Sequence, residues 1–144
     1  FVRDALGPKL KETGLKTKIY AFDHNYNYDN MLEQQGYPMK IYEDENAASF
    51  LTGAAYHNYG GDREELNNVN GKFPDKELIF TETSIGMWND GRNLEKRLME
   101  DMEETALGTV NNWCKAVIVW NLMLEPRGWL PDLLWCRGYR SLGL

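Results

Sequence analysis

The run Leu78-Ile79-Phe80-Thr81-Glu82 is typical of an apolar β-strand, and it ends abruptly in a carboxylate. The turn sequence Phe73-Pro74-Asp75-Lys76 precedes it, and the small, mostly polar run Thr83-Ser84-Ile85-Gly86 follows it. Glu82 is therefore predicted to lie where a strand opens into a loop, a position that suits a catalytic carboxylate. The alternative is a solvated glutamate at the surface, because most glutamates in proteins are exposed.

Three other segments repeat this layout of an apolar strand followed by polar residues. They are Lys16–Phe22 followed by Asp23-His24-Asn25, Ala54–Tyr56 followed by His57-Asn58-Tyr59, and Ala116–Trp120 followed by Asn121. In a parallel sheet the carboxyl ends of all strands lie at one edge, where α/β folds place their active sites. We therefore expect the polar residues of these strand ends to converge on one face.

Helices are predicted between the strands. They are Arg3–Thr13 ending at Gly14, a helix capped by Asp44 that extends through Leu51 to Gly53, the helix Glu64–Val69 capped by Asp62, and the amphipathic segment Asn93–Trp113. A long polar stretch, Tyr26–Tyr42, separates the first two strands from one another. The alternation of helices with nearly continuous apolar strands predicts an α/β fold with a parallel sheet that is covered on its faces.

Length and charge limit the possible functions. The 144 residues are enough for one domain with a sizeable core. The chain begins at Phe1 without a signal peptide, so we expect it to be a piece of a longer protein. The net charge is -6 and the largest basic cluster is Lys16-Thr17-Lys18, which argues against nucleic acid or an anionic membrane as partner and favours a neutral substrate. No apolar run approaches the ~20 residues of a membrane span.

Neither a metal nor a cofactor is expected. Cys114 and Cys136 lack the spacing of a zinc site, and no H-E-x-x-H arrangement includes His24 or His57. The chain has no G-x-G-x-x-G or P-loop sequence, which argues against a nucleotide-binding fold. The five Trp and eight Tyr residues favour sugar rings as ligands, although aromatic side chains also build cores.

The order of motifs along the chain resembles glycoside hydrolase family 30, which includes glucosylceramidases and endo-β-1,6-glucanases, and its bacterial members most of all. The segments that carry the resemblance are Leu6-Gly7-Pro8, Lys18–Asn25, Tyr56–Gly61, Lys72–Asp75 leading to Phe80–Glu82, and Val119–Leu122. The resemblance implies a (β/α)8 TIM barrel. Residues 1–125 would form its C-terminal half, a half-barrel with the predicted strands as strands five to eight. Residues 126–144 depart from the family pattern and are expected to be a divergent tail.

The resemblance also implies roles for single residues. Glu82 matches the nucleophile of a retaining glycosidase, which attacks the anomeric carbon of a β-linked sugar while Tyr59 and a neighbouring imidazole hold its carboxylate ionised. The positions expected to bind the substrate are Asp23, His24, His57, Tyr59, Trp88, Trp120 and Asn121. The alternatives are a packed histidine at the strand end for His57, a core position for Trp120, and packing on the barrel rim for Trp88.

A retaining glycosidase also needs an acid/base carboxyl group about 5–5.5 Å from the nucleophile. In the family this Glu follows an Asn at the end of the fourth strand, and no Asn-Glu motif ends a predicted strand here. We therefore expect the acid/base to lie upstream of Phe1 and the 144 residues alone to hydrolyse little. A non-catalytic carbohydrate-binding or structural remnant of the same fold is the second interpretation. The sequence leaves open whether the substrate is glucosylceramide, β-1,6-glucan or a xylan-like chain.

A half-barrel leaves two strand edges open, at Lys16–Phe22 and at Ala116–Trp120. Open edges pair readily with other chains, so we expect the molecule to form homo-oligomers. The resemblance to bacterial glycosidases implies a secreted, periplasmic or cell-surface location.

Overall fold

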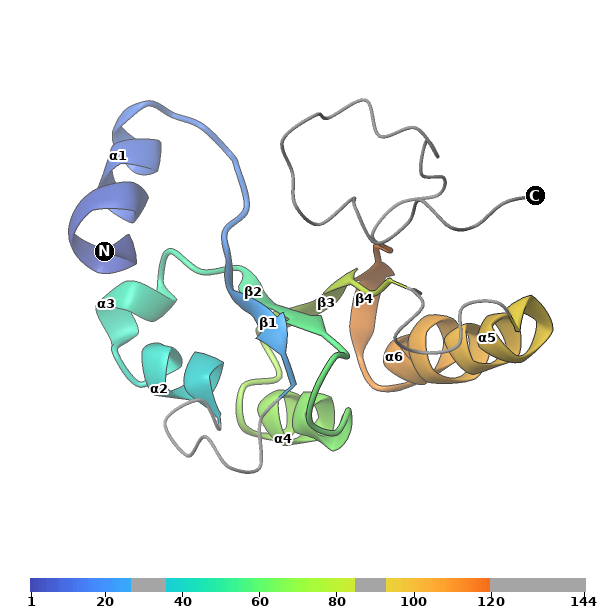
Figure 1. The fold of residues 1–144 in the computed structure, drawn as a ribbon. Coiled ribbons are helices and arrows are strands. Elements are labelled where there is room, and N and C mark those ends of the chain that lie inside the picture. The colour runs from blue at the N-terminus through green and yellow to red at the C-terminus, as the bar shows by residue number, and fades with distance from the viewer. Residues whose placement is uncertain (27–35, 85–92, 120–144) are drawn as a thin grey trace, which may run out of the picture.

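The structure is a computed structural model that describes residues 1–26, 36–84 and 93–119. Helices and strands alternate along it (Figure 1). The strands are β1 (Tyr20–Asn25), β2 (Gly53–His57), β3 (Glu77–Glu82) and β4 (Cys114–Val117). The helices are η1 (Val2–Leu6), α1 (Gly7–Glu12), α2 (Tyr37–Tyr42), α3 (Glu45–Ala48), α4 (Glu64–Lys72), α5 (Leu94–Glu100), η3 (Asp101–Leu107) and α6 (Gly108–Asn111), where η marks turns wound as π-helix.

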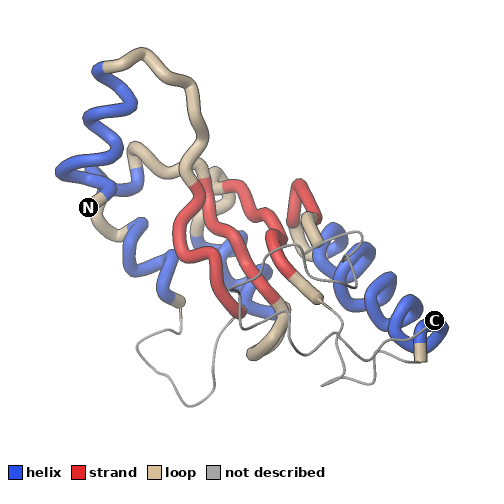
Figure 2. The backbone as a smooth tube through the Cα atoms, turned by 45° about the horizontal axis from the view of Figure 1, so that its top comes forward, coloured by secondary structure: helices blue, strands red, loops and turns tan. Residues whose placement is uncertain are grey.

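The strands form one parallel sheet in the order β1-β2-β3-β4. Figure 2 shows them side by side and flanked by helices. A helical connection joins each strand to the next, as parallel pairing requires. The predicted α/β fold is confirmed, and the strand order fits consecutive strands of a (β/α)8 barrel.

The core lies between the sheet and the helices. Alternate residues of β3 point into it, since Leu78 and Phe80 are buried whereas Ile79 is only half-buried. The buried cluster also contains Tyr26, Tyr42, Leu51, Ala54, Tyr56, Leu66, Val69 and Cys114. Because burying one side chain of the size of Leu or Phe contributes about 1.5–3 kcal/mol, a slip of one residue in β3 would be costly. The core therefore fixes which residues reach the end of the strand.

A side-chain cap confirms one of the predicted helix starts, that of α3. Asp44 Oδ1 accepts hydrogen bonds from the backbone N–H groups of Asn46 and Ala47 at 3.0 and 3.1 Å. The N-cap of α4 is Arg63 and not the predicted Asp62, although Asp62 Oδ1 accepts a hydrogen bond of 2.8 Å from the N–H of Glu64, the first residue of the helix. Such oxygens satisfy amide groups that have no partner inside the first helical turn. Asp44 thus marks the start of α3, whereas Asp62 lies one residue before the N-cap of α4.

The segment from α5 through η3 to α6 is one continuous helical run between residues 94 and 111. It packs through small residues, because Thr105, Gly108 and Thr109 are buried. The apolar residues that predict the helix include four exposed ones, Leu98, Met102, Val110 and Trp113. The helix is confirmed, but these four residues of its apolar stripe are exposed and do not belong to the core.

The first strand differs from its prediction at both ends. β1 begins at Tyr20 and not at Lys16, because β2 begins at Gly53, which pairs with Tyr20 and gives the earlier residues no strand partner. β1 also continues through Asn25, so that Asp23 lies inside the strand and not after it. Pairing with the neighbouring strand therefore decides these boundaries, and local composition does not.

Other boundaries also move. Gly53 opens β2 and does not end the helix before it. The helix α2 occupies the end of the polar stretch Tyr26–Tyr42, for which the sequence predicts no helix. β4 covers Cys114–Val117 and begins at Cys114 rather than Ala116, because its pairing with β3 begins at Cys114. None of the helices in the described ranges is long and apolar enough to cross a membrane.

Candidate active site

Three polar residues lie in one row across the carboxyl ends of β1, β2 and β3. Asn25 is the Cα partner of His57, and His57 is the Cα partner of Glu82. Glu82 is the last residue of β3, where the sequence predicts it, and it is half-buried. The fold thus places these residues side by side at the carboxyl ends of the parallel strands, where α/β enzymes carry their active sites.

The row depends on an irregularity in β3. Tyr56 pairs with Phe80 and the next residue, His57, pairs with Glu82, so Thr81 is an extra residue without a Cα partner in β2. Regular alternation along β3 would place Glu82 on the same face as Phe80, which is the core face. The bulge at Thr81 instead brings Glu82 into register with His57.

β1 carries an extra residue of the same kind, Asp23. Its Oδ1 atom accepts hydrogen bonds from two groups, His57 Nε2 at 3.1 Å and Thr81 Oγ1 at 2.7 Å. The Asp23 side chain is 65% exposed, whereas that of His57 is 13% exposed. A carboxylate at the surface therefore contacts a mostly buried imidazole and the bulge residue that precedes Glu82.

His24 and Tyr59 lie around this row. The Tyr59 N–H donates to Asn25 Oδ1 at 3.1 Å, and the Tyr59 hydroxyl donates to Ser84 Oγ at 3.0 Å. The His57 ring is edge-on to the rings of His24 and Tyr59, with centroid distances of 6.4 and 6.2 Å. Rings that combine flat faces with polar edges suit a sugar, which presents both C–H and O–H groups.

The structure brings together most of the residues that the sequence predicts for the site, namely Asp23, His24, His57, Tyr59 and Glu82. The remaining three, Trp88, Trp120 and Asn121, lie outside the described residues.

Two hydrogen-bonding residues of the site, Thr81 and Ser84, are not predicted from the sequence. Thr81 bonds to Asp23, and Ser84 bonds to Tyr59. The only signal for Thr81 is its polarity inside an otherwise apolar strand. That signal does not predict a bulge, because a surface-facing threonine is common in strands.

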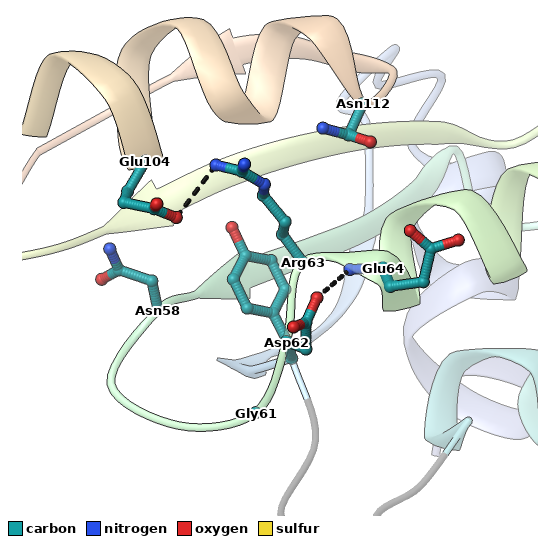
Figure 3. A pocket seen from close by; sticks show the side chains of 8 residues that line it. Asn58, Gly61, Asp62, Arg63, Glu64, Glu104 and Asn112 are labelled. Carbon is teal, nitrogen blue, oxygen red and sulfur yellow. Dashed lines mark hydrogen bonds and ion pairs between the residues drawn. The ribbon is translucent and has the colours of Figure 1, made fainter. Parts of the chain in front are cut away.

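A separate pocket of about 510 Å³ lies between the loop after β2 and the helical run that precedes β4 (Figure 3). Its lining residues are Tyr26, Asn58, Gly61, Asp62, Arg63, Glu64, Glu104 and Asn112. Arg63 forms an ion pair of 2.9 Å with Glu104, and burial raises the pKa of Tyr26. Neither His57 nor Glu82 lines this pocket. The Arg63–Glu104 ion pair connects the segment after β2 to η3. The pocket is therefore distinct from the row of residues at the strand ends.

Metal and thiol chemistry have few candidate residues here. Within residues 1–26, 36–84 and 93–119, no group of three or more His, Cys, Asp or Glu side chains is placed to hold a metal ion. Cys114 is buried in the core, and burial raises the pKa of its thiol to about 12. A thiol in that state is inert at neutral pH, so Cys114 is a packing residue.

Comparison with known proteins agrees with this geometry. The family model of the glycosyl hydrolase family 30 TIM-barrel domain matches residues 1–141. Endo-1,6-beta-D-glucanase BGN16.3 of Trichoderma harzianum is 29% identical over 126 residues, which are 84% of this chain and 22% of that protein. Among solved structures, the endo-beta1,6-glucanase BT3312 has a TM-score of 0.82 and 72% identity, over 85% of this chain and 27% of that chain.

A more distant solved structure, SrfJ from Salmonella typhimurium, has a TM-score of 0.70 and 26% identity over the same shares of the two chains, 85% and 27%. This chain therefore spans about a quarter of the length of the relatives that it matches.

Proposed function

Because this chain belongs to glycosyl hydrolase family 30, we propose that it forms the part of a retaining β-glucanase active site that carries the nucleophile, Glu82. The proposal depends above all on the pairing of Glu82 with His57 at the carboxyl end of β3. We propose β-1,6-glucan as the substrate. The 72% identity to a solved endo-beta1,6-glucanase supports that linkage.

In the proposed reaction a carboxylate oxygen of Glu82 attacks the anomeric carbon of a glucosyl unit. A covalent glycosyl ester forms on Glu82 while the bond between that carbon and the leaving-group oxygen breaks. A second carboxyl group protonates the leaving oxygen and then activates the water that hydrolyses the ester. We place this acid/base outside the 144 residues, because the relatives extend well beyond the part that this chain matches.

The rings of His24, His57 and Tyr59 are proposed to contact the sugar, together with Trp88, Trp120 and Asn121 from outside the described residues. A glucan polymer does not cross membranes unaided, so the same proposal places the enzyme at the cell surface, in the periplasm or in the medium. Without an acid to protonate the leaving group, the 144 residues alone are expected to hydrolyse ordinary β-glucosides very slowly.

The nucleophile is tested with a β-glucoside that has a dinitrophenolate leaving group and a fluorine next to the anomeric carbon. The phenolate leaves with its electron pair and needs no proton, and the fluorine slows hydrolysis of the ester. We expect peptide mass spectrometry to find one glycosyl unit on the peptide that carries Glu82. The label should be absent from Glu82→Gln and retained by Glu43→Gln, which changes an exposed glutamate at the end of α2.

Two outcomes would contradict the assignment. One is a label on another carboxylate, and the other is a label that Glu82→Gln retains. Sugar binding without any adduct would favour the non-catalytic, carbohydrate-binding interpretation. The linkage is tested separately with the full-length enzyme, which we expect to cleave β-1,6-linked gluco-oligosaccharides faster than β-1,3-linked or β-1,4-linked ones. Equal rates on the three linkages would contradict the proposed substrate.

A further inference from the structure

Two bulges face each other across β2. Asp23 is the extra residue of β1 and Thr81 is the extra residue of β3, and neither has a Cα partner in β2. Their side chains nevertheless meet, because the Thr81 hydroxyl donates a hydrogen bond of 2.7 Å to Asp23 Oδ1. A bulge re-aims a side chain out of the regular pattern of its strand. Here two bulges aim their side chains at one another.

The backbone of β1 is strained at this point. Phe22 has a φ of 79° and Asp23 a φ of 51°, and both values lie in the left-handed region that residues other than glycine rarely adopt. Such strain persists only where the surrounding structure holds it, and it is concentrated at functional sites. One of these two strained residues, Asp23, carries the carboxylate that bonds to Thr81 and to His57.

We propose that Asp23 is a positioning residue that acts on Glu82 through two others. Through Thr81 it holds the bulge that brings Glu82 into register with His57, and through His57 Nε2 it fixes the orientation and tautomer of the imidazole. A carboxylate only accepts hydrogen bonds, so the proton of a neutral His57 lies on Nε2 and its Nδ1 keeps a lone pair. The catalytic consequence rests on the proposed function of Glu82, whereas the contacts of Asp23 do not.

The hydroxyl of Thr81 has an alternative hydrogen bond that the carboxylate of Asp23 prevents. This hydroxyl has one proton and two possible acceptors, Asp23 Oδ1 at 2.7 Å and the Tyr56 carbonyl oxygen at 3.3 Å. The shorter bond is to the charged acceptor, and charge-assisted bonds are the stronger ones. Without Asp23 the hydroxyl would turn to the Tyr56 carbonyl oxygen within the sheet. Because Asp23 is largely exposed, its loss should change the local geometry much more than the overall stability.

The first test is spectroscopic and needs no catalysis. Long-range proton–nitrogen NMR of the chain with labelled histidines reports which ring nitrogen of His57 carries the proton. We expect the Nε2-protonated form in the wild type, a mixture of tautomers in Asp23→Ala, and the wild-type spectrum in Asp75→Ala. Asp75 is also exposed and contacts only Lys76, at 3.7 Å, among its described ion pairs, so it is a matched control.

Asp23→Asn is the second variant, since its amide oxygen can still accept both hydrogen bonds without carrying the charge. If Asp23→Ala fails to fold, Asp23→Asn replaces it in the test, and we expect this variant to retain the wild-type tautomer of His57. An unchanged His57 spectrum in a folded Asp23→Ala would overturn the proposal. Loss of the Nε2 proton in Asp75→Ala as well would equally overturn it, because the effect would then not be specific to Asp23.

The second test measures the rate at which the activated fluoro-glucoside labels Glu82. For a positioning residue, Asp23→Ala should lower the maximal labelling rate about tenfold or more, because small misplacements of reacting groups carry large rate penalties. The glucoside concentration that gives half this rate should stay the same. A raised concentration with an unchanged maximal rate would show a substrate contact instead. If the wild type is not labelled at all, the proposed function of Glu82 is wrong. The NMR result then tests by itself whether Asp23 positions His57.

Discussion

The Tyr20 hydroxyl donates a hydrogen bond of 2.6 Å to Glu77 across β2. Tyr20 pairs with Gly53 and Gly53 pairs with Glu77, so the contact spans a position that has no side chain. The ammonium groups of Lys18 and Lys115 lie 2.9 and 3.3 Å from the same carboxylate. Glu77 thus connects three segments of the sheet at the end opposite Glu82.

This cluster predicts an acid-dependent stability. The hydrogen bond from Tyr20, followed by the contacts with Lys18 and Lys115, lowers the pKa of Glu77 to about 2. In the unfolded chain the pKa returns to the ordinary value of about 4.3. The unfolded state therefore binds this proton more readily, so the contribution of Glu77 is complete above that value and is lost as the pH falls towards 2.

We therefore expect the free energy of unfolding of Glu77→Gln, measured in urea, to be lower than that of the wild type at neutral pH. It should also fall less steeply between about pH 5 and pH 2. Glu43→Gln, at an exposed glutamate, should reproduce the wild-type slope. Parallel curves for Glu77→Gln and the wild type would show that the carboxylate is not coupled to folding.

Gly53 predicts a second effect at the same place. A Cβ atom there would overlap the backbone carbonyl oxygen of Glu77, which cannot move away as a flexible side chain can. We expect Gly53→Ala to lower the free energy of unfolding by at least the ~1–3 kcal/mol typical of overpacked positions. Gly71→Ala in α4 is the matched control, because a Cβ there meets open space, and it should gain about 0.5–1 kcal/mol. A Gly53→Ala chain as stable as the wild type would contradict the pairing of β2 with β3.

The sequence predicts the alternation of helices and strands well because each signal is local. The cap Asp44, the carboxylate of Asp62 that binds the first amide of α4, and the apolar run that leads to Glu82 all lie within a few residues of the elements that they indicate. The start of β1 at Tyr20 depends instead on where β2 begins, more than thirty residues later. No local pattern contains that information, and so the predicted strand begins too early.

The candidate site divides in the same way. A parallel strand order is enough to predict that His57 and Glu82 lie near one another. The contact of Asp23 with Thr81 needs an extra residue in each of two strands, and a bulge leaves no trace in the composition of either strand. The sequence could therefore identify the members of the site but not the bonds between them.

Cys114 provides a test of the core by its reactivity. Because burial raises the pKa of its thiol to about 12, almost no thiolate is present at neutral or mildly alkaline pH. We expect iodoacetamide to leave Cys114 unmodified in the native chain and to modify it fully in urea, as measured by peptide mass spectrometry. Equal rates in both conditions would show that β4 is not packed against the core.

Replacing tyrosine by phenylalanine is expected to have opposite effects on stability at Tyr56 and at Tyr20. Tyr56 is fully buried, and within the described residues its hydroxyl has no hydrogen-bond partner. Burying an unpaired polar group costs about 1–3 kcal/mol, so Tyr56→Phe should be at least as stable as the wild type while it keeps the ring stacked on Tyr26. Tyr20→Phe should be less stable, because Glu77 loses its shortest hydrogen bond. Urea unfolding of the two variants measures the difference, and a larger loss in Tyr56→Phe would mean that the Tyr56 hydroxyl has a partner in the folded protein.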